Sequence, residues 1–388
     1  MPETTLQEKV SHAFYARFQE RPAMVVRAPG RVNLIGEHTD YNDGFVLPVA
    51  VDRAAWLAIS PRDDTWTTIR AMDMKNDERT FPVDRVPSST GGWADYPKGV
   101  IWAMLEEGLA PGGINGVLSS DVPVGAGMSS SAAVEVTFAY AWNQLGDLGM
   151  TLPEIALLCQ KAENHYVGVN CGIMDQMISA CGRAGHAMML DTRTLERAYF
   201  KMPEGVAIVV ADSMVRRSLS GSEYNVRRAQ CEQAVSVIQE RLPEVSALRD
   251  VTPQQLEQFR QSMSDVVYQR ARHVVTENAR VLHVSRALYE GRIEDVGHML
   301  IEGHRSLRDD YEVSIAELDT LVDAATQVEG CYGARLTGAG FGGCIIALVA
   351  EEAVPNVKAH LNEVYETAYG KLPAVYVTLP DDGVARMS

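Results

Sequence analysis

The stretch Ser120–Glu135, SDVPVGAGMSSSAAVE, constrains the fold of this chain more than any other segment. Apolar residues 114–118 before it predict a strand, and the pattern Val134, Phe138, Trp142 within and after it predicts a helix. Glycines let a backbone approach a ligand closely, and the N–H groups and dipole of a helix N-terminus favour an anion such as phosphate. The alternative interpretation is an ordinary glycine turn that leads into a serine-capped helix.

A polar segment near the N-terminus, Gly30–Gly44, follows a predicted strand over residues 24–29 and is called the first loop below. It brings Glu37, His38 and Asp40 close together along the chain. A carbohydrate site requires such closely spaced carboxylate and imidazole groups as hydrogen-bond acceptors and donors. A solvated surface turn is the alternative, but it fits poorly because apolar residues lie within the loop and on both sides. A helix is predicted over residues 5–19, and further strands over residues 45–50, 53–59 and 66–72.

A third segment, Gly168–Gln176, joins two predicted helices through glycines and carries Asp175 between two methionines. Because isolated burial of a carboxylate is costly, Asp175 is predicted to be paired or functional. The alternative is that Asp175 caps a helix that begins near residue 173 or 174. The preceding helix, predicted over residues 152–167, carries Glu163.

A helix predicted over residues 93–107 begins at Trp93, which is interpreted either as a core residue or as an exposed stacking residue. Strands are predicted over residues 186–191, 197–202 and 206–211, and a domain boundary between residues 195 and 210. The chain beyond it is mostly helical, with helices predicted over residues 222–241, 253–261, 267–289, 293–307, 314–328 and 355–369. Four arginines are predicted to lie on solvated helix faces: Arg216, Arg217, Arg227 and Arg228.

A second glycine-rich turn, Gly333–Cys344, precedes a strand predicted to end at Val349. A dinucleotide fingerprint would need a helix after the glycines, and GxxxxGK[ST] is absent, as are the HRD and DFG motifs of protein kinases. The turn is therefore predicted to pack its backbone closely beside the glycine loop of Ser120–Glu135. One more strand is predicted over residues 374–378.

The length of 388 residues predicts two domains, and the net charge of −16 argues against a nucleic-acid or anionic-membrane partner. The six cysteines form no CxxC pair and no zinc-like spacing, which is typical of reduced thiols in a cytoplasmic protein. The N-terminal residues lack the form of a signal peptide, and no apolar run is long enough to span a membrane. We expect a monomer.

These motifs carry a family resemblance. Within the first loop, Gly30–Tyr41 matches the galactokinase signature. Pro123–Ala133 resembles the phosphate loop of the GHMP kinases, and Leu336–Gly343 is similar to that family's third motif. The resemblance spans nearly the whole chain and implies an α/β (α+β) GHMP kinase fold of two domains. Residues 1–200 would form a ribosomal-S5-like N-terminal domain and residues 201–388 a ferredoxin-like C-terminal domain, with the active site in the cleft between them.

The resemblance further implies ATP-dependent phosphorylation of the C1 hydroxyl of α-D-galactose, with galactose and ATP as small-molecule substrates and Mg²⁺ as a second cofactor. The implied catalytic pair is Asp175 and Arg31. The implied sugar ligands are Glu37, His38, Asp40, Gly172 and Tyr224. The implied nucleotide-binding residues are Trp93, Gly125, Ala126, Gly127, Met128, Ser129, Ser130 and Ser131, and the implied Mg²⁺ ligands are Ser131 and Glu163.

Phosphoryl transfer depends on positioning and charge neutralisation, which an arginine, a carboxylate and Mg²⁺ provide. Asp175 would either take the proton of the sugar hydroxyl or only orient it. Three alternatives stay open: a related kinase such as an N-acetylgalactosamine kinase, a non-catalytic sensor of galactose and ATP on the same fold, and a Rossmann-type dinucleotide binder. Sensors of this kind lack the Ser-Ala pair found here as Ser131 and Ala132, and the chain lacks the Rossmann fingerprint.

Overall fold

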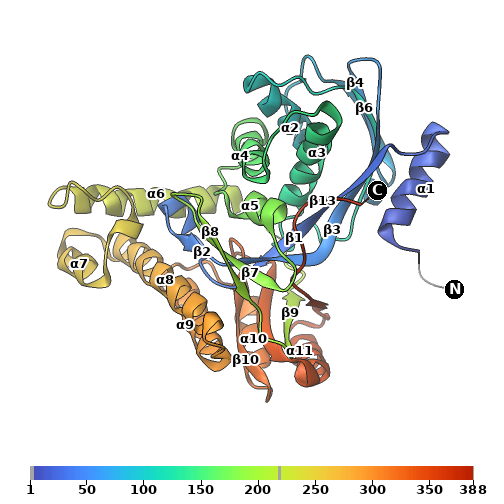
Figure 1. Cartoon of the computed structure of the whole chain (residues 1–388). Helices are drawn as coiled ribbons and strands as arrows, with labels where there is room; N and C mark the ends of the chain where they lie inside the picture. Colours follow the sequence, from blue (N-terminus) through green and yellow to red (C-terminus); the bar gives the residue numbers. More distant parts are fainter. Residues whose placement is uncertain (1–3, 217–219, 388) are drawn as a thin grey trace.

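The computed structural model describes residues 4–216 and 220–387 (Figure 1). The chain begins with helix α1 (Leu6–Phe18), whose N-terminus is closed by a capping box between Thr5 and Glu8. Val10 and Phe14, one helical turn apart, are fully buried and cover a small apolar cluster on the outer face of the first sheet. The predicted N-terminal helix is thus confirmed, because its apolar stripe finds a sheet to cover.

The first sheet has six strands in the order β13-β1-β3-β6-β4-β5. Their bounds are β1 Met24–Asn33, β3 Pro48–Pro61, β4 Trp66–Ala71, β5 Asp77–Pro82, β6 Ile114–Ser120 and β13 Ala385–Arg386. Two predicted boundaries are wrong: β1 continues beyond residue 29, and β3 is one strand where two were expected. Both follow from a single antiparallel ladder between β1 and β3, which continues past a bulge at Pro29.

Four helices cover the inner face of this sheet: α2 Asp95–Glu106, α3 Ser130–Gly146, α4 Leu152–Ala162 and α5 Met174–Cys181. The prediction that α2 begins at Trp93 is wrong, because the Asp95 carboxylate accepts N–H groups of Thr90 and Gly91 and holds a turn there. The predicted α4 ends early, since a π-helical turn over Glu163–Val167 replaces its last residues. Tyr96 on α2, Ser131 on α3 and Asp175 on α5 all border one cavity.

A small sheet in the order β2-β7-β8 lies between the two halves of the molecule, with β2 Phe45–Val46, β7 His186–Asp191 and β8 Arg197–Lys201 (Figure 1). The second large sheet has the order β10-β11-β9-β12, with β9 Val206–Asp212, β10 Cys331–Thr337, β11 Cys344–Ala350 and β12 Ala374–Thr378. The helices of this half are α6 Ser220–Gln239, α7 Pro253–Gln258, α8 Asp265–Tyr289, α9 Ile293–Asp309, α10 Ala316–Thr326 and α11 Val354–Tyr369. Among the described helices, none is long and apolar enough to cross a bilayer.

Strand β11 is buried along its whole length and divides its side chains between two apolar cores. Ile346 and Leu348 pack into the core of the first half, whereas Ile345 and Val349 pack into the core formed with the helices of the second half. This alternation is the two-residue period of a strand covered on both faces. The proposed domain division after residue 200 stays a prediction: β9 begins the second sheet shortly after it, but β13 pairs with β1 of the first.

Candidate active site

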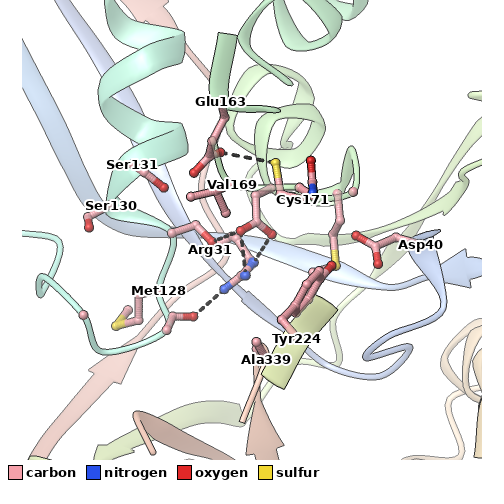
Figure 2. Close-up of a pocket in the computed structure, with 18 of the residues that line it drawn as sticks. Arg31, Asp40, Met128, Ser130, Ser131, Glu163, Val169, Cys171, Tyr224 and Ala339 are labelled. Carbon is pink, nitrogen blue, oxygen red and sulfur yellow. Dashed lines mark hydrogen bonds and ion pairs between the residues drawn. The ribbon is translucent and has the colours of Figure 1, made fainter. Parts of the chain in front are cut away.

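A cavity of about 520 Å³ opens where the first loop, the segment 123–131, the segment 168–175 and the second glycine turn approach one another. Figure 2 shows Arg31 between Ser130 and Ser131 on one side and Asp40 and Tyr224 on the other. Most of the predicted site residues border this cavity: Arg31, Glu37, His38, Asp40, Gly125, Gly127, Met128, Ser129, Ser130, Ser131, Glu163, Gly172, Asp175 and Tyr224. Four segments far apart in the sequence therefore meet at one place.

Arg31, on β1, and Asp175, in the first turn of α5, form a two-point ion pair at the centre of the cavity. The Nε–Oδ1 and Nη2–Oδ2 distances are both 2.8 Å, the geometry of the strongest arginine–carboxylate pairs. Arg31 also donates to the carbonyl of Gly127, and the hydroxyl of Ser129 donates to Asp175. The N-cap alternative for Asp175 is wrong, because Ile173 occupies that position; the side chain is paired and 27% exposed to the cavity.

The loop before α3 has the backbone of an anion site. Gly125 and Gly127 have φ angles of 71° and 81°, and Ser129 has a φ of 56°, so three residues are in the left-handed region that glycine adopts most readily. The hydroxyl of Ser129 is directed to Asp175 and, within the described chain, does not cap α3. The N-terminus of α3 therefore borders the cavity at Ser130 and Ser131, where a helix favours a phosphate.

Glu163 lies opposite the start of α3, with its carboxylate directed toward Ser131 (Figure 2). Its Oε2 accepts the side-chain N–H of Gln176 at 2.6 Å and lies 3.4 Å from the thiol of Cys171. Burial, together with the charge of Asp175, raises the pKa of Glu163 to about 7, whereas a hydrogen bond from Ser131 acts to lower it. The concentration of acidic groups here favours a cation.

Asp40 and Gly172 are in very close contact across the cavity. A Cβ atom placed on Gly172 would lie 1.9 Å from Asp40 Oδ2, so only glycine leaves room for the carboxylate at this point. Burial and the charge of Asp175 raise the pKa of Asp40 to about 6. Burial also raises the pKa of Tyr224, which keeps its hydroxyl protonated beside Asp40.

Glu37 and His38 connect the first loop to the second half of the chain. Glu37 Oε1 accepts the N–H of Gly338 at 3.3 Å, and burial raises the pKa of this carboxyl to about 7. His38 Nε2 lies 3.2 Å from the carbonyl of Ala339 and must donate to it, so in the neutral ring Nδ1 accepts from the hydroxyl of Tyr41 at 2.8 Å. Both side chains thus border the cavity and also hold its two walls together.

Three family models match the sequence. "Galactokinase galactose-binding signature" matches residues 12–61, "GHMP kinases N terminal domain" residues 95–183, and "GHMP kinases C terminal" residues 284–367. A galactokinase of Roseiflexus sp. (strain RS-1) is 47% identical over 375 residues, which cover 96% of each chain. The chain belongs to the galactokinase family. A galactokinase of Chloroflexus aggregans is 46% identical over the same shares.

Solved structures agree with membership of the galactokinase family. The crystal structure of Lactococcus lactis galactokinase complexed with galactose has a TM-score of 0.95 and 32% identity, covering 98% of this chain and all of that one. A mevalonate kinase of Methanococcus jannaschii, at a TM-score of 0.66 and 17% identity, shares the fold alone and covers 92% of this chain and 98% of its own. The predicted two-domain GHMP fold is confirmed.

Some residues of this galactokinase-family chain lie elsewhere than predicted. Trp93 and Ala126 do not border the cavity; the indole N–H of Trp93 donates to Asp77 at 2.8 Å, and Ala126 is fully buried. Arg227 is buried rather than solvated, because its guanidinium donates to the carbonyl of Tyr311. Arg228 lies on an exposed face of α6 as predicted, whereas Arg216 is exposed but precedes that helix and pairs with the buried Asp212; Arg217 lies outside the described residues.

The second glycine turn does pack its backbone closely, but against other neighbours than predicted. A Cβ on Gly340 would lie 2.3 Å from the carbonyl of Val313, and one on Gly342 would lie 2.7 Å from that of Val215. Sequence reasoning also missed Tyr96, which borders the cavity, and Glu135, which is fully buried near Gln176. Glu135 is one helical turn after Ser131, a spacing that could have indicated it.

Proposed function

We propose that this chain transfers the terminal phosphoryl group of ATP to the C1 hydroxyl of α-D-galactose, giving galactose 1-phosphate and ADP. The observation that carries this proposal is the Arg31–Asp175 pair, which lies where the first loop meets the loop before α3. At this point a sugar hydroxyl can be held by the sugar ligands on one side, and the phosphoryl group of ATP by the phosphate site on the other. Family membership and the galactose complex of the Lactococcus lactis relative support the same reaction.

In this proposal Asp175 accepts a hydrogen bond from the C1 hydroxyl and either takes its proton or orients it. Arg31 fixes the direction of the Asp175 carboxylate through two N–H groups and neutralises charge that develops on the transferred group. Because the two residues are held together before substrate binds, little reorganisation is needed during transfer. Residual exposure of Asp175 leaves its oxygens accessible from the cavity.

Galactose would bind against Asp40, Gly172 and Tyr224, with Glu37 and His38 at the same wall. An ionised Asp40 only accepts hydrogen bonds, so it would select hydroxyl groups of defined direction. A site built to bind a hydroxyl rejects the epimer that lacks it, by a factor that can reach ~10⁴. We therefore propose that galactose is preferred over glucose, which differs from it only at the C4 hydroxyl.

The nucleotide phosphates would bind along Gly125–Ser131 and at the N-terminus of α3, and Mg²⁺ would bind at Ser131 and Glu163. Within the described residues no cluster of three acidic, histidine or cysteine side chains offers a complete metal cage. Two protein oxygens nevertheless suit Mg²⁺, which keeps several waters and takes its remaining ligands from substrate phosphates. When bound, this ion would neutralise phosphate charge. The role of Trp93 as an aromatic residue of the nucleotide site stays a prediction.

The direct test is a coupled assay of ADP release with galactose, 2-deoxygalactose, glucose and N-acetylgalactosamine as acceptors. The proposal expects turnover with the first two sugars and almost none with glucose. Comparable kcat/KM for glucose would refute it, and a preference for N-acetylgalactosamine would assign the related kinase instead. Binding of galactose and ATP without turnover would assign a sensor.

We further propose that the protein is a cytoplasmic monomer. None of the six cysteines, all of which lie within the described residues, forms a disulfide, which is typical of proteins in a reducing compartment. Light scattering after gel filtration tests the monomer, for which a mass near 42.5 kDa is expected.

A further inference from the structure

One face of α8 holds the backbone of the first loop. Glu277 Oε1 accepts the N–H of Gly36 at 2.9 Å, and His273 Nε2 donates to the carbonyl of Glu37 at 3.2 Å. His273 and Glu277 are four residues apart, so they lie on the same side of the helix. The loop that carries the proposed sugar ligands is thus attached to a helix of the other half of the chain.

A buried guanidinium joins this helix to the Glu37 side chain. Arg335 is on β10; its Nη1 lies 2.8 Å from Glu277 Oε1, and its Nη2 lies 2.5 Å from Glu37 Oε2. The exposed fractions of the Arg335, Glu277 and Glu37 side chains are 0%, 0% and 1%. Arg280 closes the outer end of this chain of charges, with its Nε 2.7 Å from Glu277 Oε2. Alternating charges held this tightly out of water fix the geometry of every member, because removing one leaves another unpaired.

A glycine on α9 makes room for the guanidinium. A Cβ atom on Gly303 would lie 2.9 Å from Arg335 Nη1 and 3.3 Å from Glu277 Oε2. Three elements of the second half, α8, α9 and β10, are therefore shaped around one arginine whose other partner is a residue of the first loop.

We propose that Arg335 and Glu277 are positioning residues for sugar binding: Arg335 pairs with the Glu37 carboxylate, favours its charged form and directs it at the cavity wall, and Glu277 holds both Arg335 and the backbone of the first loop in place. This inference rests on the proposed function, in which Glu37 is a ligand of galactose. Neither residue touches the cavity, so both would act only through the first loop.

The charges that face Glu37 determine the sign of the effect. Burial is the largest influence and raises the pKa of Glu37; Arg335 lowers it, Glu277 raises it, and the N–H of Gly338 and the charge of Arg31 lower it. An ionised carboxylate only accepts hydrogen bonds and accepts them more strongly than the acid does, so galactose binding should weaken as the pH falls through about 7. The fall of galactose binding at low pH is called the acid limb. Removing Arg335 should move the acid limb to higher pH, and removing Glu277 should move it to lower pH.

The experiment measures galactose binding by titration calorimetry without ATP, and kcat/KM for galactose, between pH 5 and 9. Arg335→Gln is expected to move the acid limb up, and Glu277→Gln down, each by about 1 pH unit, as for loss of one neighbouring charge. Gly303→Ala displaces Arg335 without removing any charge and should move the limb in the same direction as Arg335→Gln. KM for ATP should stay within about twofold in all three variants, a change worth less than ~0.5 kcal/mol.

Arg27→Gln is the matched control, because Arg27 is also a buried arginine that pairs with an aspartate, Asp381, and the partners of its guanidinium lie outside the first loop. It should lower the melting temperature and leave the acid limb in place. The inference is overturned if Glu277→Gln and Gly303→Ala leave the limb unmoved, or move it together, whatever the folding yield of Arg335→Gln. Failure of the unsubstituted protein to bind or phosphorylate galactose would instead refute the proposed function.

Discussion

Replacing Gly172 with alanine should weaken galactose use while leaving ATP use intact. The new methyl carbon would lie 1.9 Å from Asp40 Oδ2 and 2.3 Å from Asp40 Cγ, whereas non-bonded heavy atoms are at their best separation near ~3.5 Å. The carboxylate must therefore move by more than ~1 Å, which is enough to lose a hydrogen bond to a sugar hydroxyl. A hydrogen bond to a charged group contributes ~1.5–3 kcal/mol, and each ~1.4 kcal/mol is a factor of ten in affinity.

The expected loss in kcat/KM for galactose is therefore ~10- to ~150-fold, with KM for ATP unchanged. Gly112→Ala is the control, because a Cβ there meets open space, and it should retain full activity. Asp40→Ala should cost a similar factor, and the double variant Gly172→Ala/Asp40→Ala should be little worse than either single change, since both remove the same interaction. Additive losses in the double variant, or normal galactose use by Gly172→Ala, would refute the proposed contact.

Three further predictions address the chemistry and its pH dependence. Asp175→Asn should keep the fold and lower kcat by ~10² or more, as is usual for acid–base and positioning groups; near-normal turnover would remove Asp175 from the mechanism. Ser131→Ala and Glu163→Gln should each raise the Mg²⁺ concentration needed for half-maximal rate, and an unchanged requirement in both would place the metal elsewhere. Asp40, whose pKa is raised to about 6, should bind galactose in its ionised form, so the dissociation constant measured by calorimetry should rise as the pH falls below about 6. Asp40→Asn should remove this lower limb only, and a limb that persists in that variant would exclude Asp40 as its source.

The sequence was informative where a local pattern decides the structure. The glycine and serine run before Ser130 predicts the start of α3, because backbone conformation and helix termini depend on neighbouring residues. The hydrophobic pattern predicts a helix from Trp93, but α2 begins only at Asp95, because a carboxylate that holds its own turn leaves no signal in such a pattern. Element boundaries are decided by such single hydrogen bonds.

The parts that could not be predicted depend on contacts between distant segments. Gly36 and Glu277 are 241 residues apart along the chain, and no spacing rule relates them. The usual exposure of charged side chains predicts a solvated Arg227, but the carbonyls of Tyr311 and Glu312 accept from its guanidinium inside the protein. Likewise, the segment Gly333–Cys344 indicates only a glycine turn, and the fold is needed to show that Arg335, within this segment, reaches Glu37.

The pairing of β13 with β1 has a mechanical consequence. The final residues leave the second sheet after β12 and bind the first half again, where Val51 pairs with Pro380, and Met387 donates its N–H to Val25. The second half is therefore attached to the first at both of its ends, in addition to the packing of β11 into both cores and the ion pair between Arg335 and Glu37. Loss of the last residues would remove one of these attachments, so the second half should then move more freely against the first.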